Sequence, residues 1–176
     1  NPEQLVSYGL LARHLISAGS PDKALESLKT VVDRNPRDIG AWILAASIHE
    51  QRSDWTRARE AYEKAHAINP RLAAVNNNLA YLIGERFGEL DRALELAKTA
   101  RELAPTNGNI ADTYGWLLYK RGDYAQAQRV LREAADREAG SAEIRFHLGM
   151  AQYALGDETS ATASFEAALG KDAQGT

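Results

Sequence analysis

The chain has 176 residues, of which 44% are hydrophobic, and this composition is sufficient for an ordinary folded protein. Its 24 acidic residues outnumber its 21 Lys and Arg residues, which argues against nucleic acid as a ligand because binding of a polyanion requires a basic surface. Cysteine is absent, which excludes disulfides, thiolate zinc sites and cysteine nucleophiles.

The first part of the chain, up to residue 38, predicts two helices. Apolar residues recur there at three- and four-residue steps, so they line one face of each helix. They are Leu5, Tyr8, Leu11, Ala12 and Leu15 in the first helix, and Ala24, Leu25, Leu28, Val31 and Val32 in the second. Gly19 is expected to end the first helix with a positive φ, and Pro36 to stop the second because proline has no N–H.

The same pattern then recurs along the chain. The turn that begins at Gly19 has five copies, each ending in alanine 34 or 35 residues after the last: Ala24, Ala58, Ala93, Ala127 and Ala161. The period predicts repeats at 5–38, 39–72, 73–107, 108–141 and 142–172, with a remnant of a preceding repeat at 1–4 and a tail at 173–176. The second helices are expected to be capped at Ser20, Asp54, Asp91, Asp123 and Asp157.

Three irregularities carry further expectations. The third repeat has one extra residue near 84–88, which predicts a slightly extended first helix or a looser turn. Pro2 occupies the place of the proline of a preceding repeat, so we expect at least one more repeat upstream. The last helix, 158–169, is rich in Thr, Ser, Ala and Glu, and such a polar outer face is typical of a terminal repeat.

These features resemble the tetratricopeptide repeat, a helix–turn–helix unit of 34 residues. Its bulky-then-small residue pair occurs as Leu11-Ala12, Leu79-Ala80, Tyr114-Gly115 and Leu148-Gly149, and its characteristic alanine occurs in all five copies of the turn. The resemblance implies an all-α fold, a right-handed α-solenoid of about five helix–turn–helix units and ten helices. It also implies that first-helix side chains face a concave wall, which binds other polypeptides.

The residues that this resemblance places on the wall include many aromatic side chains. The candidate site consists of Arg13, Asn77, Asn78, Tyr81, Trp116, Tyr119, Phe146, His147, Met150 and Tyr153. Aromatic residues and Met are favoured at protein interfaces. Among these residues, Trp116 is the first candidate for contact with a partner. The alternative stays open that aromatic residues are frequent at these repeat positions even where the repeats are selected only for stability. Four other aromatic residues, Trp42, Trp55, Tyr62 and Tyr124, are assigned to core packing.

No motif for catalysis, a cofactor or a metal is recognisable. The four histidines lack the spacing of a helical zinc site, and His147 is expected to face the groove; the acidic residues are expected at solvent-facing positions. No Gly-rich phosphate loop or nucleophile motif occurs. Two binding modes known in the family are also excluded. The family's two-carboxylate clamp requires Lys and Arg side chains at set positions of three consecutive repeats, and no three consecutive repeats of this chain supply them. An asparagine ladder requires Asn at one position in successive repeats, and only Asn78 occupies that position.

The function indicated is a protein-interaction scaffold that binds a peptide or partner helix in the groove and is part of a larger bacterial protein. Two alternatives stay open: self-assembly into a homo-oligomer, and a regulatory domain of a larger enzyme or of an envelope or exopolysaccharide assembly system. No apolar stretch approaches the roughly 20 residues needed to cross a bilayer, so no direct membrane insertion is expected. The partner and the compartment, cytoplasmic or periplasmic and envelope-attached, stay open.

Overall fold

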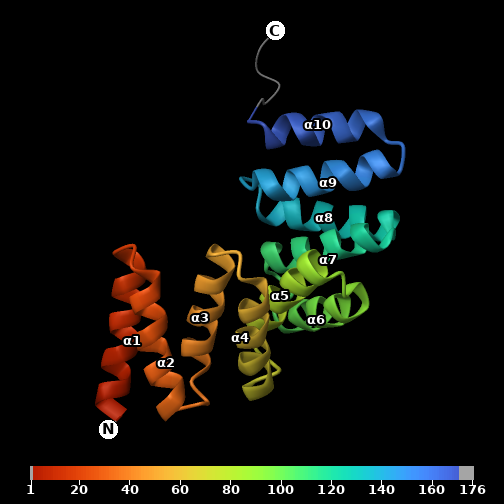
Figure 1. Ribbon diagram of the computed structural model, residues 1–176. Coiled ribbons are helices and arrows are strands. Elements are labelled where there is room, and N and C mark those ends of the chain that lie inside the picture. Colours follow the sequence, from red (N-terminus) through yellow and green to blue (C-terminus); the bar gives the residue numbers. More distant parts are fainter. Residues whose placement is uncertain (1, 171–176) are drawn as a thin grey trace. The chain divides into compact units, whose positions relative to one another are not determined.

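The computed structural model describes residues 2–170, and the side chains of residues 10–170. Every regular element in that stretch is helical: ten α-helices and one π-helical segment (Figure 1). The all-α prediction is therefore confirmed, as is the number of α-helices. The chain divides into two compact units, residues 1–79 and 80–176. No helix within residues 2–170 is long and apolar enough to span a bilayer.

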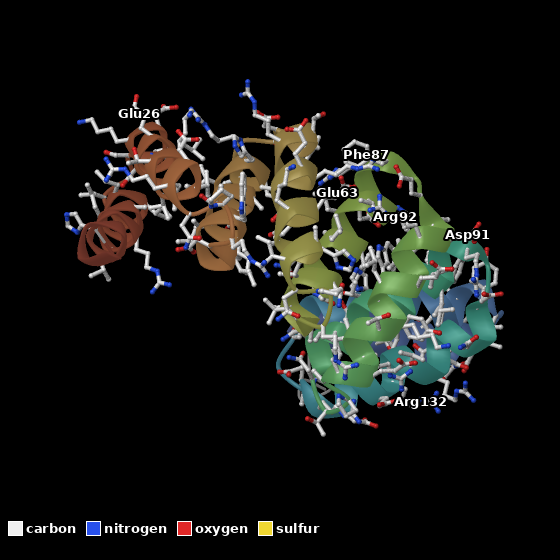
Figure 2. The ribbon with its side chains drawn as sticks, turned by 90° about the horizontal axis from the view of Figure 1, so that it is seen from below. Glu26, Glu63, Phe87, Asp91, Arg92 and Arg132 are labelled. Carbon is white, nitrogen blue, oxygen red and sulfur yellow. The ribbon has the colours of Figure 1, made fainter. Side chains whose placement is uncertain are left out.

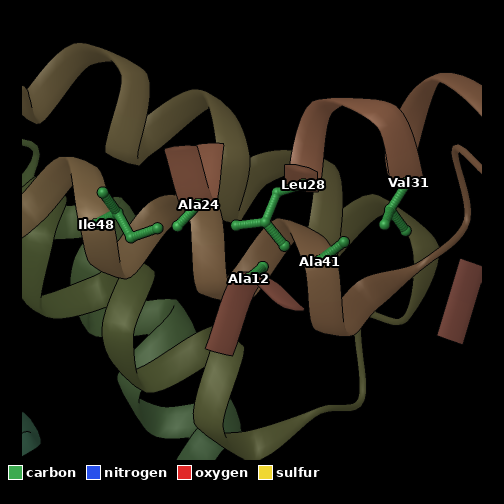
Figure 3. Packing of buried hydrophobic residues seen from close by; sticks show 6 residues of the cluster. All are labelled: Ala12, Ala24, Leu28, Val31, Ala41 and Ile48. Carbon is green, nitrogen blue, oxygen red and sulfur yellow. The ribbon is translucent and has the colours of Figure 1, made fainter. Parts of the chain in front are cut away.

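The first unit is built from helical hairpins. Its helices are α1 (Pro2–Ser17), α2 (Pro21–Arg34), α3 (Ile39–Gln51) and α4 (Trp55–Ile68), and α5 (Ala73–Leu82) begins in it. α1 packs on α2, α2 on α3, and α3 on α4. Figure 3 shows the core of this unit, a cluster of Ala12, Ala24, Leu28, Val31, Ala41 and Ile48. The alanines let the helices approach closely, and the larger side chains fill the space between hairpins.

The second unit repeats this packing. It contains the π-helical segment η1 (Ile83–Phe87) and α6 (Leu90–Leu103), α7 (Gly108–Arg121), α8 (Tyr124–Arg137), α9 (Ala142–Ala154) and α10 (Glu158–Ala168). A Cβ atom on Gly115 would lie 2.7 Å from Leu131 Cγ, and one on Gly149 would lie 2.5 Å from Phe165 Cε1. The small residue of the repeat is therefore required where the large residue of the following helix packs against it.

The extra residue of the third repeat is absorbed in η1, which continues α5 by one wider turn to Phe87. The expected extension of the first helix is confirmed, in π-helical form. Gly84 lies within this turn, and a Cβ atom there would come within 2.3 Å of Leu117 Cδ2. The wider turn therefore keeps a close approach between η1 and α7.

The expected helix ends are partly confirmed. Gly19, Gly88, Gly122 and Gly156 all have positive φ, and Ser53 takes the same conformation at φ 57°. Asp54 and Asp157 accept the backbone N–H of Arg57 and Ser160. Ser20 and Asp123 occupy N-cap positions, but their side chains do not accept a backbone N–H of the helix.

The prediction for Asp91 is wrong. The helix α6 begins at Leu90 with Glu89 as its N-cap residue, so Asp91 falls inside the first turn and is exposed (Figure 2). A carboxylate in the first helical turn still interacts favourably with the helix dipole. Side-chain caps also occur on first helices, at positions that were not predicted: Asp38, Asn107 and Ser141 accept backbone N–H groups there.

Of the four aromatic residues assigned to the core, only Tyr62 is confirmed there. Tyr62 is 1% exposed, and Trp42 and Trp55 are partly buried. Tyr124 is 38% exposed, so its assignment to the core is wrong. It is the first residue of α8, where the ring lies at the end of the hairpin and contacts Tyr119 at a centroid distance of 5.4 Å.

Candidate partner-binding surface

The first helices of the second unit place a set of aromatic and acidic side chains together. On α7, Asp112, Trp116 and Tyr119 follow one another at steps of four and three residues, so they share one face. On α9, Phe146, Met150 and Tyr153 do the same. The α5–η1 run adds Tyr81 and Glu85. We call this surface the aromatic face, and define it as Tyr81, Glu85, Trp116, Tyr119, Glu143, Phe146, Met150 and Tyr153.

The half-buried indole ring of Trp116 stacks with two neighbouring rings. Its centroid lies 4.2 Å from that of His147 at an interplanar angle of 17°, and 5.0 Å from that of Tyr119 at 12°. Aromatic pairs of this kind contribute roughly 0.5–1.5 kcal/mol beyond the area they bury. The stack joins α7 to α9 and fixes the orientation of the indole.

The indole N–H of Trp116 is also engaged. It donates to Glu85 Oε1 at 2.8 Å, and Lys120 Nζ donates to the same oxygen at 2.8 Å. Two groups of α7 therefore hold the carboxylate that η1 presents. Since its ring is stacked and its donor is bonded, Trp116 acts mainly to position its neighbours.

Below this stack lies a buried polar pair. His147 Nδ1 lies 2.9 Å from Asp112 Oδ1 and 3.1 Å from Oδ2. His147 is 6% exposed and Asp112 is 8% exposed. Because a carboxylate only accepts, Nδ1 donates to it. The expectation that His147 faces the groove is therefore wrong: the ring lies beneath Trp116 and is held by a carboxylate.

The acidic partner was missed in the sequence, where acidic side chains were expected at the solvent. Its signal was the spacing: Asp112 and His147 lie 35 residues apart, close to one repeat, on the first helices of neighbouring repeats. Residues separated by one period occupy adjacent helices in such an array. A buried polar group needs a partner, and this spacing supplies one.

Other residues of the aromatic face remain open to solvent. Tyr153 is 62% exposed and Phe146 is 46% exposed, although the Phe146 ring contacts Phe165 at a centroid distance of 5.8 Å. Met150 lies between them in sequence and is partly buried. Exposed large apolar side chains in line along a helix are characteristic of interaction surfaces.

The electrostatic environment of this surface is acidic. Burial raises the pKa of Tyr81 above its ordinary value, and the carboxylates of Glu85, Glu143 and Asp112 raise that pKa further, while Arg86 opposes them. All three carboxylates therefore act on one phenol, although they come from different helices. Acidic side chains from η1, α7 and α9 therefore lie near Tyr81 on the aromatic face.

Seven of the ten predicted site residues belong to the second unit: Tyr81, Trp116, Tyr119, Phe146, His147, Met150 and Tyr153. The other three lie in the first unit. Arg13 is exposed on α1, and Asn77 Nδ2 donates to Asn78 Oδ1 at 3.4 Å. Asn78 Nδ2 donates to the Tyr62 hydroxyl at 3.3 Å, so this donor is already engaged within the unit.

The Tyr62 hydroxyl in turn donates to Glu50 Oε2 at 2.8 Å. Burial raises the pKa of Tyr62, and the neighbouring Glu50 carboxylate raises it further. This chain of bonds from Asn78 to Glu50 stabilises the first unit. Among residues 10–170, whose side chains the structure describes, we find no group of three or more His, Asp or Glu side chains arranged to hold a metal ion.

The chain is similar in sequence to parts of longer known proteins. It is 28% identical over 142 residues to the TPR repeat-containing protein PA4667 of Pseudomonas aeruginosa, covering 81% of this chain and 24% of that protein. It is 27% identical over 127 residues to the protein O-mannosyl-transferase TMTC1 of Mus musculus, covering 70% of this chain and 14% of that one. The chain thus spans about a quarter or less of the length of these relatives.

Two solved structures share the fold. MamA 41-end from Desulfovibrio magneticus RS-1 has a TM-score of 0.83 at 16% identity, covering 95% of this chain and 93% of that one. YrrB, described as a TPR protein with an unusual peptide-binding site, has a TM-score of 0.79 at 17% identity, covering 99% of this chain and 89% of that one. The tetratricopeptide repeat profile matches residues 10–73 and 115–176. Since these matches span most of the sequence, the chain belongs to the tetratricopeptide repeat family.

Proposed function

We propose that the chain is a protein-interaction scaffold and that its aromatic face binds a polypeptide segment of a partner. Tetratricopeptide repeats are generally protein–protein interaction modules and usually carry no catalytic groups. The observation that carries the proposal is the exposure of Phe146 and Tyr153 along one line of α9. Burying both rings against a partner would remove a large apolar area from water.

The surface beside these rings is already ordered. The bonds from Trp116 and Lys120 to Glu85, together with the Asp112–His147 pair, fix the side chains around them. Binding to a preorganised surface costs less conformational entropy than binding to a mobile one. The peptide-binding site named in the description of YrrB is consistent with this role, since that protein has the same fold.

We infer no catalytic role for this stretch of chain and propose that it works within a larger bacterial protein. The relative PA4667 is bacterial, and the chain covers 24% of its length. A scaffold of this type positions partners for activities located elsewhere, including enzymes or envelope assembly systems.

The test is affinity capture of partners by the immobilised chain, compared with its Phe146→Ala/Tyr153→Ala double variant. We expect the specific partner to be lost from the double variant while the far-ultraviolet CD spectrum stays unchanged, because both rings are exposed. Leu169→Ala is the matched control, since Leu169 is 71% exposed at the end of α10 and lies outside the aromatic face. Equal capture by all three proteins would refute the proposal.

Self-assembly is the competing function, and one observation favours it. Leu155 and Leu169 are 43% and 71% exposed, so the last hairpin presents apolar side chains of its own. Light scattering over a range of protein concentrations separates the two functions. A concentration-dependent dimer that Leu169→Arg abolishes would support self-assembly, and a monomer at every concentration would exclude it.

A further inference from the structure

We propose that the segment bound by the aromatic face carries a Lys or Arg side chain beside large apolar residues, and that this cation pairs with Glu143. The inference rests on the proposed function and adds the chemistry of the partner. It follows from the charges on the aromatic face, their partners and their place on α9.

The acidic side chains near Tyr81 differ in whether they are already paired. Glu85 accepts from Lys120 and Trp116, and Asp112 is held by His147. Glu143 is exposed in the first turn of α9, and its carboxylate has no hydrogen bond or ion pair within the part of the chain that the structure describes. One negative charge of the surface is therefore available to a ligand.

The position of Glu143 places it in line with the exposed rings. It precedes Phe146 by three residues, and Phe146 precedes Met150 by four and Tyr153 by seven. Residues three and four apart are neighbours on a helix surface. A cation that reaches Glu143 therefore lies about one helical turn from the Phe146 ring, whose face also attracts cations.

The same charges discriminate against an acidic partner. Tyr81 lies within the influence of three carboxylates, of which Glu143 is the one without a partner. An acidic segment would bring a like charge against that group, and like charges in an interface cost binding energy. A neutral apolar segment would leave the carboxylate partly desolvated and unpaired. A segment with a Lys or Arg beside large apolar residues would pack against the exposed rings and pair with the Glu143 carboxylate.

The experiment uses a phage-displayed library of short random peptides, selected against the immobilised chain. Binders retained by the Phe146→Ala/Tyr153→Ala double variant are removed, so that the remaining peptides depend on the aromatic face. The selection is then repeated on the Glu143→Lys variant. Glu102→Lys is the control, because Glu102 is exposed on α6 and the substitution changes the net charge equally. CD melting verifies that each variant is folded.

We expect peptides from the original chain and from the control to be enriched in Lys or Arg beside aromatic or large aliphatic residues. On the Glu143→Lys variant, the basic preference should disappear or reverse to acidic. A recovered basic peptide should bind that variant roughly tenfold or more weakly, because a like charge replaces an attraction.

The possible failures are distinguishable. Peptides that depend on the rings but show no basic preference, or whose preference survives Glu143→Lys, would overturn the inference and leave the proposed function intact. Recovery of no peptide that depends on the rings would overturn the proposed function and the inference with it.

Discussion

Trp116 on α7 and Glu85 on η1 are joined by a hydrogen bond of 2.8 Å, although they lie 31 residues apart in sequence. The bond connects two neighbouring repeats through the only donor of the indole ring. Because Lys120 shares the accepting oxygen, the pair is part of a charge-assisted network. Trp116 therefore holds the Glu85 carboxylate in place, and the loss of this bond should lower the stability of the chain.

Trp116→Phe keeps an aromatic ring in the stack but removes the N–H group. We expect it to destabilise the chain by about 1–3 kcal/mol, since a partly buried bond to a carboxylate is lost. Trp116→Ala, which also removes the stack, should cost roughly 3–5 kcal/mol. Urea unfolding followed by CD measures both changes. A Phe variant as stable as the original would show that the hydrogen bond to Glu85 contributes nothing.

Asp112→Ala removes the acceptor of a buried histidine. The loss leaves the Nδ1–H of His147 without its partner, so we expect a destabilisation of about 1–3 kcal/mol by urea unfolding at neutral pH. Asp136→Ala is the matched control, because Asp136 is exposed on α8. That change should stay within about 0.5 kcal/mol of zero. Similar effects of the two substitutions would argue against a structural role for the Asp112–His147 pair.

Gly149→Ala tests the close packing of α9 and α10. The added methyl group would lie 2.5 Å from Phe165 Cε1, so the ring must move and we expect a loss of about 1–3 kcal/mol. Gly140→Ala is the control, since a Cβ atom there meets nothing within 4 Å. It should be neutral or slightly stabilising, by less than about 1 kcal/mol. Thermal unfolding of both variants decides the question, and a harmless Gly149→Ala would contradict the packing.

His49 provides a pH-dependent contribution to stability. Burial lowers the pKa of this imidazole below its ordinary value, and Asp54, whose Oδ2 lies 3.5 Å away, offsets part of the effect. The unfolded chain then binds the proton more readily than the folded chain, so stability falls as pH is lowered through the ordinary pKa of about 6.5 toward the lower folded value.

The matched variant is His49→Gln, which cannot bind the proton. The midpoint of urea unfolding is measured at neutral pH and at about pH 5.5 for both proteins. The decrease in midpoint from neutral pH to the lower pH should be larger for the original chain than for the variant. Equal falls would show that His49 does not carry the difference, and a smaller fall for the original chain would contradict the direction of the pKa shift.

The helices were predictable from the sequence because periodic apolar residues determine which faces must be buried. Ala24, Leu28 and Val31 fall in the core of the first unit as expected. The glycines at the turns have the positive φ that their position in the repeat requires. These properties depend on the spacing of apolar residues and on the positions of glycine, both of which can be read from a single sequence.

The polar contacts of the aromatic face were not predicted. Periodicity places Trp116 and His147 on the same kind of helix position, but it does not state that His147 lies beneath Trp116 and binds Asp112. Tyr124 is 38% exposed at the start of α8, which its place in the repeat did not predict. Such features arise from contacts between repeats, and a pattern within one repeat does not contain them.

The wider helical turn at Ile83–Phe87 shows how this architecture tolerates a change in length. In an ordinary α-helix one inserted residue rotates every later side chain by about 100°. Here the distortion ends at Gly88, and Ala127 and Ala161 follow Ala93 at the usual intervals. Insertions in such arrays can therefore be accommodated where they occur. One repeat can therefore change in length while the repeats after it keep their packing partners.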